Sequence, residues 1–211
     1  MHPWFLGHRA QESPPVRTAA VRDTTGDAAM RSLLDRPATQ PAVRPETGTW
    51  VLDPSTAVVG FRGRAHRFAP VVSAVFEGAR GILSLLEDGQ GSVEVDVDVA
   101  SLTTGCAAYD EVLARADPFD ALRHPVATFC STSVVWSAGR ALVDGTLSAG
   151  GGSAPVTLSG TYRTAGERTA LQARGTVDRR AIGLTIDVPG LGLLLPARLD
   201  LHVDVQAVRS P

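Results

Sequence analysis

The sequence predicts an all-β fold, an antiparallel closed barrel of about eight strands with one short helical crossover. Three observations predict it. Short segments alternate apolar and polar residues, which is typical of strands with one buried face. Turn residues separate these segments at short intervals. A single run of the chain also carries helical spacing between two strand-like segments.

That run lies in the middle of the chain. Residues 93–99 alternate valine with acidic residues, so they predict a half-buried strand that ends at a turn at residues 103–105. Residues 107–116 place apolar side chains three and four positions apart, which indicates an amphipathic helix. Pro118 is expected to stop this helix, and Pro125 opens an extended segment rich in β-branched residues.

The later strands follow the same alternation. Residues 199–206 alternate apolar and polar side chains, so one face is expected to be dry and the other wet. Arg179 and Arg180 are placed on a strand, where neighbouring side chains point to opposite faces. Turns are predicted at Arg80-Gly81, Asp88-Gly89, Ala138-Gly139, residues 150–153, Ala165-Gly166 and residues 189–192.

The first 46 residues differ in composition from the rest. They hold clustered prolines and few large apolar side chains, so they predict a mostly disordered N-terminal extension. Residues 27–36 could form a short amphipathic helix after an Asp cap, either transient or docked on the barrel. The barrel domain is therefore assigned to residues 47–211.

A series of short motifs runs in the same order along most of this domain. They are Trp50–Pro54, Val59–Phe61, Asp98–Leu102, Thr104-Gly105, Ala116–Asp120, His124-Pro125, Gly145–Leu147, Pro155–Leu158, Asp178–Leu184 and Val205–Val208. In these motifs the chain resembles the YceI-like family, whose members are lipocalin-like β-barrels associated with binding polyisoprenoid lipids. Two segments depart from the family pattern. Ser55-Thr56 stands where many relatives carry His-Ser, and residues 149–152 lack the histidine of a later family segment.

The resemblance implies a non-enzymatic protein that binds, transports or sequesters a long-chain isoprenoid lipid inside the barrel. A polyprenyl alcohol, a polyprenyl phosphate and an isoprenoid quinone all remain open as ligands. The residues expected to contact this ligand are inward-facing apolar and aromatic side chains. They are Phe61, Phe76, Val95, Val97, Phe129, Leu147, Leu158, Tyr162, Leu184, Ile186 and Leu201. The same side chains would also suit a filled core.

Composition removes several other classes of function. The formal net charge is −2, and acids and arginines are interspersed, so nucleic-acid binding is not expected. The chain has no lysine, which excludes a P-loop and Schiff-base chemistry. His66, His124 and His202 lack the spacing of metal ligands. No catalytic residue, cofactor or metal is therefore expected, and Cys106 and Cys130 do not form a disulfide framework.

No segment is apolar over the roughly 18 residues that a transmembrane helix needs. The start of the chain lacks the pattern of a secretion signal, so a cytoplasmic location is expected. The Ala-, Arg- and Gly-rich composition suggests a bacterial genome rich in G and C. Transient membrane contact and a homodimer remain open.

Two other hypotheses for the barrel belong to different classes. An enzyme acting on a small hydrophobic metabolite would need converging titratable groups, and the candidates are His66 and Tyr162 with Arg179 or Arg180. A filled barrel could instead serve as an interaction module, with the N-terminal extension as its partner-binding arm.

The charged residues Asp117, Asp120, Arg123 and His124 in the crossover also have two interpretations. They could gate the mouth of the barrel, or they could cap local turns and pair at the surface. The second interpretation is preferred.

Overall fold

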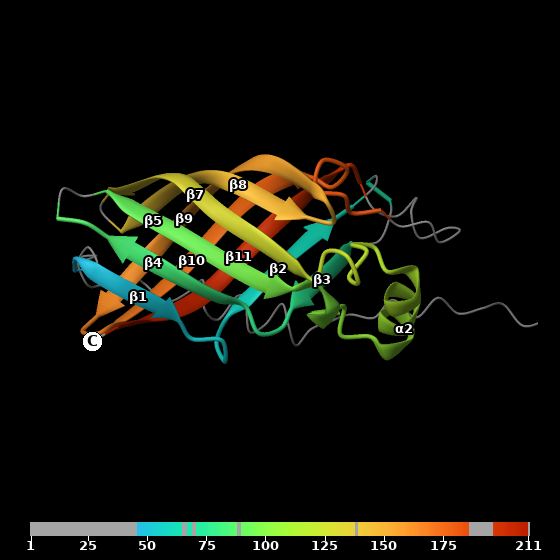
Figure 1. Cartoon of the computed structure of the whole chain (residues 1–211), viewed down its shortest axis with the longest axis horizontal. Coiled ribbons are helices and arrows are strands. Elements are labelled where there is room, and N and C mark those ends of the chain that lie inside the picture. The colour runs from blue at the N-terminus through green and yellow to red at the C-terminus, as the bar shows by residue number, and fades with distance from the viewer. Residues whose placement is uncertain are drawn as a thin grey trace, which may run out of the picture. The chain divides into compact units, whose positions relative to one another are not determined.

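The strands form one antiparallel sheet that closes on itself, as the sequence predicts (Figure 1). The computed structural model describes residues 46–64, 67–68, 71–87, 90–137, 139–185 and 196–210. The strands are β1 (Gly48–Leu52), β2 (Val58–Gly63), β3 (Val72–Phe76), β4 (Arg80–Leu85), β5 (Gly91–Asp98), β6 (Leu102–Thr103), β7 (Val126–Ser137), β8 (Arg140–Ala149), β9 (Gly152–Ala165), β10 (Arg168–Asp178) and β11 (Arg198–Arg209).

These strands make eight passes along the barrel, because each of three passes is divided into two strands. β1 and β2 both pair with β11, with Leu52 opposite Ala207 and Val58 opposite Asp204. In the next pass, β3 lies beside β2 and β4 lies beside β1. In the third pass, β5 pairs with β4, the 3-10 turn η1 (Val99–Ser101) follows, and β6 pairs with β3. Pairing of β1 and β2 with β11 closes the barrel.

One predicted turn is wrong. Arg80 and Gly81 are the first residues of β4, and the connection from β3 lies just before them, at residues 77–79. Gly81 serves a different need, because a Cβ at this position would lie 2.5 Å from the backbone oxygen of Glu94 on β5. The glycine therefore permits close approach of two strands instead of a turn.

The barrel interior is apolar because alternate residues of each strand point inward. Trp50, Leu83, Leu184 and Leu199 are almost completely buried, and Phe61, Phe76 and Phe129 are buried around them. Small inward residues keep the neighbouring strands close. A Cβ at Gly160, for example, would lie 2.8 Å from the Cβ of Ala173 on β10.

The crossover between β6 and β7 holds helix α2 (Ala107–Ala116), with the bounds that the sequence predicts. Asp110 in its first turn accepts hydrogen bonds from the Thr104 hydroxyl at 2.6 Å, the Thr104 backbone N–H at 2.7 Å and the Thr103 hydroxyl at 2.8 Å. These bonds, with the Thr104 hydroxyl as the main cause, hold the pKa of the Asp110 carboxyl below its ordinary value. The helix ends at Asp117, which adopts the left-handed conformation.

The residues after α2 close one end of the barrel. Phe119 packs its ring 5.9 Å from that of Phe76, and the Thr185 backbone N–H donates to Pro118 at 3.0 Å. Buried Ile182 and Leu184 lie in the same region of the fold, after β10. Figure 1 shows α2 beyond the strand ends on this side.

The placement of Arg179 and Arg180 on a strand is wrong. β10 ends at Asp178, and both arginines lie in the turn that follows it. The Arg179 guanidinium donates to the backbone oxygens of Pro196 and Leu184 at 3.1 and 3.0 Å, so it holds this turn together.

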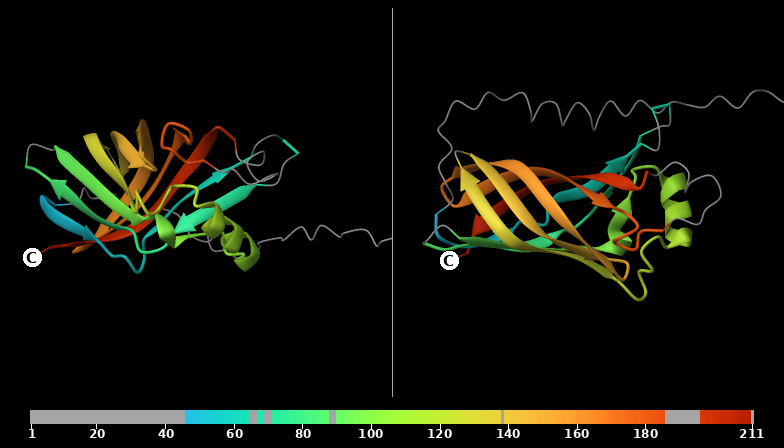
Figure 2. Two further views of the ribbon diagram at one scale, coloured as in Figure 1. Left: turned by 45° about the vertical axis from the view of Figure 1, so that its right-hand side comes forward. Right: turned by 90° about the horizontal axis from the view of Figure 1, so that it is seen from above.

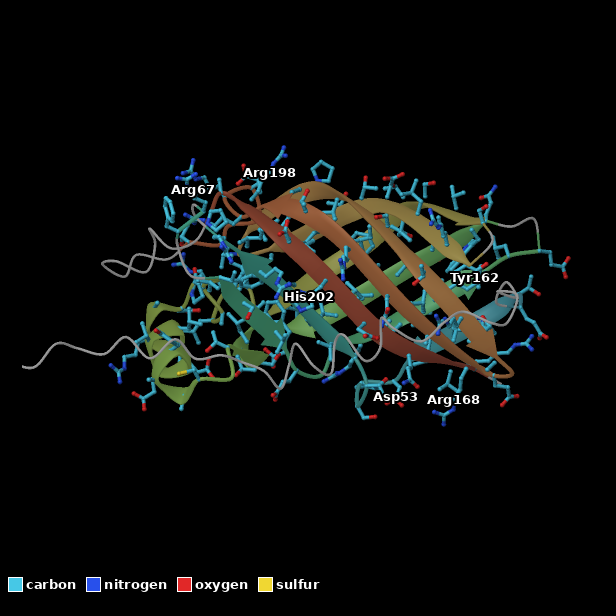
Figure 3. The ribbon with its side chains drawn as sticks, turned by 180° about the vertical axis from the view of Figure 1, so that it is seen from behind. Asp53, Arg67, Tyr162, Arg168, Arg198 and His202 are labelled. Atoms are coloured by element: carbon cyan, nitrogen blue, oxygen red, sulfur yellow. The ribbon has the colours of Figure 1, made fainter. Side chains whose placement is uncertain are left out.

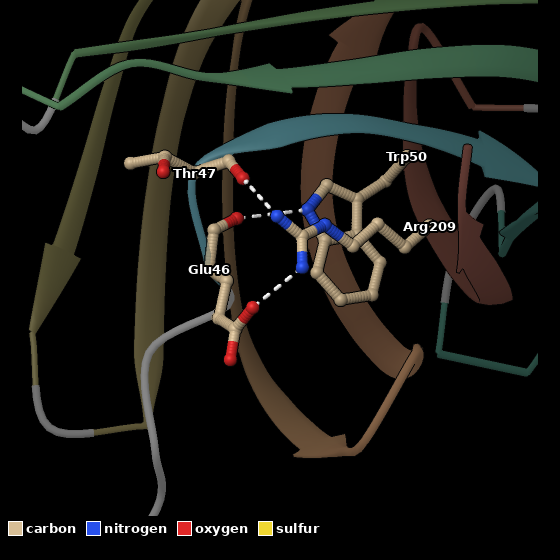
Figure 4. Close-up of polar contacts among 4 residues, drawn as sticks. All are labelled: Glu46, Thr47, Trp50 and Arg209. Carbon is tan, nitrogen blue, oxygen red and sulfur yellow. Dashed lines mark hydrogen bonds and ion pairs between the residues drawn. The ribbon is translucent and has the colours of Figure 1, made fainter. Parts of the chain in front are cut away.

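At the other end, an ion pair fastens β1 to β11 (Figure 4). The Arg209 guanidinium lies 2.6 Å from the Glu46 carboxylate and also donates to the Thr47 backbone oxygen at 3.0 Å. The Trp50 indole N–H donates to the Glu46 backbone oxygen at 3.0 Å. Glu46, which the sequence analysis assigns to the extension, therefore contacts the closing strands of the barrel.

Several predictions fall outside the described residues. These are the extension up to residue 45, its helix at residues 27–36, and the turns at residues 88–89 and 189–192. They stay predictions. The turn predicted at residues 150–153 is present at residues 150–151, while residues 152 and 153 already belong to β9. The turn at Gly166 is present, and Gly139, Gly150, Gly151 and Gly166 have positive φ.

Gly183→Ala should destabilise the protein more than Gly166→Ala. Both glycines have positive φ, so alanine costs about 1–2 kcal/mol of backbone strain at either site. At Gly183 a Cβ would also lie 2.2 Å from the Gly150 backbone oxygen, and this clash adds about 1–3 kcal/mol. At Gly166 the space is open within 4 Å. Urea unfolding of both variants measures the difference, and equal losses would contradict the close packing of the two turns.

Candidate functional site

The barrel encloses an apolar cavity of about 150 Å³. Residues from both ends of the barrel line it. Leu52 and Leu83 lie towards one end, and Phe119 and Leu184 lie towards the other. Nine of the residues that the sequence predicts as ligand contacts line this cavity, namely Phe61, Phe76, Val95, Val97, Phe129, Leu147, Leu158, Leu184 and Leu201. The fold therefore brings together side chains from seven strands and one loop.

The remaining two predicted contact residues are Tyr162 and Ile186. Tyr162 points inward from β9 and is buried, but it is not among the residues that line the cavity. Its ring packs edge-on against Trp136, with the ring centroids 4.9 Å apart, so it belongs to the packing at one end of the barrel. Figure 3 shows Tyr162 at the opposite end from Arg198. Ile186 lies outside the described residues.

Several lining residues are not among those predicted from the sequence, including Trp136, Val143, Leu171 and Phe119. Val143 alternates in phase with Leu147 on β8, so a count along that strand could have found it, whereas no residue of β10, the strand of Leu171, was selected. Phe119 lies in the crossover, where no strand pattern exists. Trp136 follows an irregularity in the β7–β8 register at residues 131–133, which shifts the alternation along β7.

The backbone ladder between β5 and β7 ends before either strand does. Their ladder runs from Asp98–Val126 to Glu94–Cys130 and stops there, although β5 starts at Gly91 and β7 continues to Ser137. Beyond this point the Ser131 hydroxyl accepts the Val93 backbone N–H at 2.7 Å. Figure 2 (left) shows the two strands diverging. We call this region, residues 91–93 and 132–137, the unpaired β5–β7 segment.

Two buried side-chain nitrogens in the described residues have no hydrogen-bond partner, Trp136 Nε1 and His202 Nδ1. The His202 ring packs over Gly60 of β2, where a Cβ would lie 2.9 Å from the ring. Burial of the imidazole is the main cause that lowers the pKa of His202, and the positive charges of Arg62 and Arg174 lower it further. The carboxylate of Asp204 acts in the opposite direction.

The charged residues of the crossover act as local caps. Asp117 accepts the Ala121 backbone N–H at 2.7 Å, and the Asp120 backbone oxygen accepts the N–H groups of Arg123 and His124. Arg123 lies 3.7 Å from the Asp120 carboxylate, and both side chains are exposed. These contacts agree with the interpretation that the charged residues cap local turns and pair at the surface.

The candidate groups for catalysis do not converge. Tyr162 lies opposite Leu171, near the start of β10, whereas Arg179 follows the end of β10 and bonds to backbone oxygens there. His66 lies outside the described residues. Among the described residues, no group of His, Cys, Asp and Glu side chains could hold a metal ion. The described helices also include none with the length and apolar character needed to cross a bilayer.

Comparison with known proteins places this barrel among related folds. The family model of the YceI-like domain matches residues 50–207. Two curated Pseudomonas putida proteins, each described as a UPF0312 protein, are 33% identical over 125 residues, which is 56% of this chain and 62% of theirs. The chain thus matches less than two thirds of the length of these relatives.

Three solved structures show the same fold. Burkholderia cenocepacia BcnA has a TM-score of 0.64 at 20% identity, over 74% of this chain and 99% of BcnA. A polyisoprenoid binding domain from Saccharophagus degradans, implicated in plant cell wall breakdown, has a TM-score of 0.59 at 14% identity, over 78% and 100%. The Campylobacter jejuni YCEI protein has a TM-score of 0.56 at 17% identity, over 69% and 90%.

His202 should make folding stability depend on pH below neutrality. Its pKa is lower in the folded protein than the ordinary value of 6.5, so the unfolded chain binds the proton first as the pH falls. The free energy of unfolding should therefore be highest above about pH 6.5 and decrease as the pH falls below it, towards the lower folded pKa. His202→Gln should flatten this part of the curve, measured by urea unfolding from pH 8 to pH 5. Identical pH slopes for both proteins would contradict the burial of a neutral imidazole.

Proposed function

Because the chain belongs to the YceI-like family, we propose that it is a lipid-binding barrel that holds a long-chain isoprenoid lipid and carries or sequesters it. The observation that carries this proposal is the apolar cavity along the barrel. Its lining gives a ligand contacts with alkyl and aromatic side chains, and an isoprenoid chain has the matching chemistry. The polyisoprenoid binding domain of Saccharophagus degradans, which shares the fold, supports this choice of ligand class.

The driving force for binding would come from burial of hydrocarbon. Each methylene removed from water contributes about 0.8 kcal/mol, so a few isoprene units provide sufficient affinity without a hydrogen bond. Most of this gain is absent when the lipid starts in a membrane, since the chain is already dry there. A barrel of this kind therefore suits a carrier that exchanges lipid during transient membrane contact. A polyprenyl alcohol, a polyprenyl phosphate and an isoprenoid quinone share the required chain.

The shape of the cavity favours an extended ligand. Its volume of about 150 Å³ is modest, yet the lining residues come from both ends of the barrel. A flexible chain can occupy a small cavity whose lining residues extend along the barrel.

Two alternative functions have less support. An enzyme needs converging reactive groups, and Tyr162 and Arg179 lie apart. A filled interaction module needs an interior occupied by side chains, whereas this interior leaves a cavity. The binding proposal accounts for the cavity directly.

Native mass spectrometry of the full-length protein, followed by solvent extraction, tests the proposal. We expect the purified protein to carry a stoichiometric isoprenoid, or the delipidated protein to take one up from added lipid. A protein that is empty and that also fails to take up polyprenyl alcohols, phosphates and quinones would rule the proposal out.

Leu158→Trp should weaken binding of a prenyl ligand at least tenfold, because Leu158 lines the cavity and a larger ring would occupy its space. Ser159→Trp is the matched control, since Ser159 is the next residue on β9 and is exposed. The readout is displacement of a hydrophobic fluorescent probe from delipidated protein, with circular dichroism to check the fold. Equal affinity of both folded variants would place the ligand elsewhere.

A further inference from the structure

The end of the barrel beside α2 carries the most exposed apolar side chains. Among the described large hydrophobic residues, Leu122 and Phe68 are the most exposed, at 95% and 78%. Leu122 lies in the crossover, and Phe68 lies in the connection between β2 and β3. Single apolar side chains are common on protein surfaces, so they indicate a partner only where further groups of suitable chemistry accompany them.

Several connections meet at this end. A Cβ at Gly63, the last residue of β2, would lie 2.7 Å from the Pro196 ring, so the β2–β3 connection begins beside the start of β11. The hydrogen bond from Thr185 to Pro118 joins the segment after β10 to the crossover. Figure 3 shows Arg67 and Arg198 near each other at this end, and Arg168 at the opposite end.

Arginines accompany Phe68. The Arg67 guanidinium lies over the Phe68 ring, 4.3 Å from its centroid, and Arg64 donates to the Arg67 backbone oxygen at 3.3 Å. Arg64, Arg67 and Arg198 are exposed, and none of the ion pairs within the described residues includes them. We call Arg64, Arg67, Phe68 and Arg198 the basic tip.

The charge pattern of the chain is one-sided around this tip. No acidic residue occurs from residue 54 to residue 76, although the chain has 22 acidic residues and a formal net charge of −2. The four acidic residues of the crossover are occupied locally, because two accept backbone hydrogen bonds and two pair with arginines. The basic tip therefore presents unpaired positive charge next to an exposed aromatic ring.

From this combination we propose that the basic tip docks the barrel on a membrane surface that contains anionic phospholipids. The arginines lie among the phosphate groups, and the Phe68 ring enters the boundary with the acyl chains. This inference rests on the proposed function, because a carrier must meet the membrane that supplies its lipid. It adds which end of the barrel makes that contact.

A lipid surface fits the tip better than other anionic partners do. A nucleic acid would satisfy the arginines, but it would leave Phe68 without hydrocarbon to enter. Each arginine near an anionic surface strengthens binding about fivefold, and the attraction falls off within about 10 Å at ordinary ionic strength. Three arginines and one ring thus give reversible binding, which a carrier needs in order to leave the membrane again.

Co-sedimentation of the full chain with vesicles that hold no prenyl lipid tests the docking site. We expect binding to vesicles of phosphatidylcholine mixed with phosphatidylglycerol, and binding at least tenfold weaker to phosphatidylcholine alone. Arg64→Gln combined with Arg67→Gln should weaken binding to the mixed vesicles about 25-fold. The matched control is Arg140→Gln combined with Arg168→Gln, since both are exposed and begin β8 and β10 at the opposite end. It should change binding less than twofold.

A second pair of variants shows which end meets the lipid. Phe68→Trp places a fluorescent ring at the tip, and its emission should shift to shorter wavelength when mixed vesicles are added. Leu86→Trp is the control, because Leu86 is also exposed, at 56%, and follows β4 at the opposite end. Its emission should stay unchanged. Circular dichroism checks that all variants keep the fold.

The results distinguish this inference from the proposed function. Absence of wild-type binding to the mixed vesicles, equal losses in the two double variants, or equal emission shifts of the two tryptophans would each overturn the docking site. A protein that docks through the tip but takes up no isoprenoid in the extraction experiment would retain the docking site and lose the proposed function. Uptake of isoprenoid without vesicle binding would have the opposite meaning.

Discussion

Closure of the sheet through β11 is the constraint on which the rest of the structure depends. β11 pairs with β10 along its length, and on its other side it pairs with β1 and β2 in turn. The ion pair of Glu46 with Arg209 and the hydrogen bond from the Trp50 indole to the Glu46 backbone oxygen join the start of β1 to the end of β11. A closed sheet leaves each strand with one inner and one outer face, so the apolar alternation of every strand converges on a single interior.

The interior is shaped by the balance of large and small residues. Aromatic side chains from β2, β3 and β7 project into it, and glycines keep neighbouring strands close. Gly145, for example, would carry a Cβ only 2.5 Å from the Phe129 ring. Such contacts fill the core without filling its axis, which is why a narrow apolar cavity remains. The crossover closes one end with Phe119, and towards the other end the backbone ladder between β5 and β7 stops at Glu94 and Cys130.

The cavity determines which kind of ligand the barrel can hold. It offers hydrocarbon contacts, which are strong but unspecific, because any apolar chain of suitable width gains from them. Polar side chains are few among the lining residues that the structure describes, and they include Gln172 and His202.

The sequence by itself determined the local features. The period-two alternation predicted the strands and the inward placement of residues such as Phe129 and Leu158, and helical spacing with Pro118 predicted helix α2. Tertiary structure decided what depends on register between distant segments. The role of Gly81 beside Glu94, the ion pair between Glu46 and Arg209, and the packing of Trp136 against Tyr162 all required partners far away in the chain. Periodicity records which face of a strand is apolar, but it carries no information on which strand lies beside it or where their pairing stops, because both depend on the packing of the whole barrel.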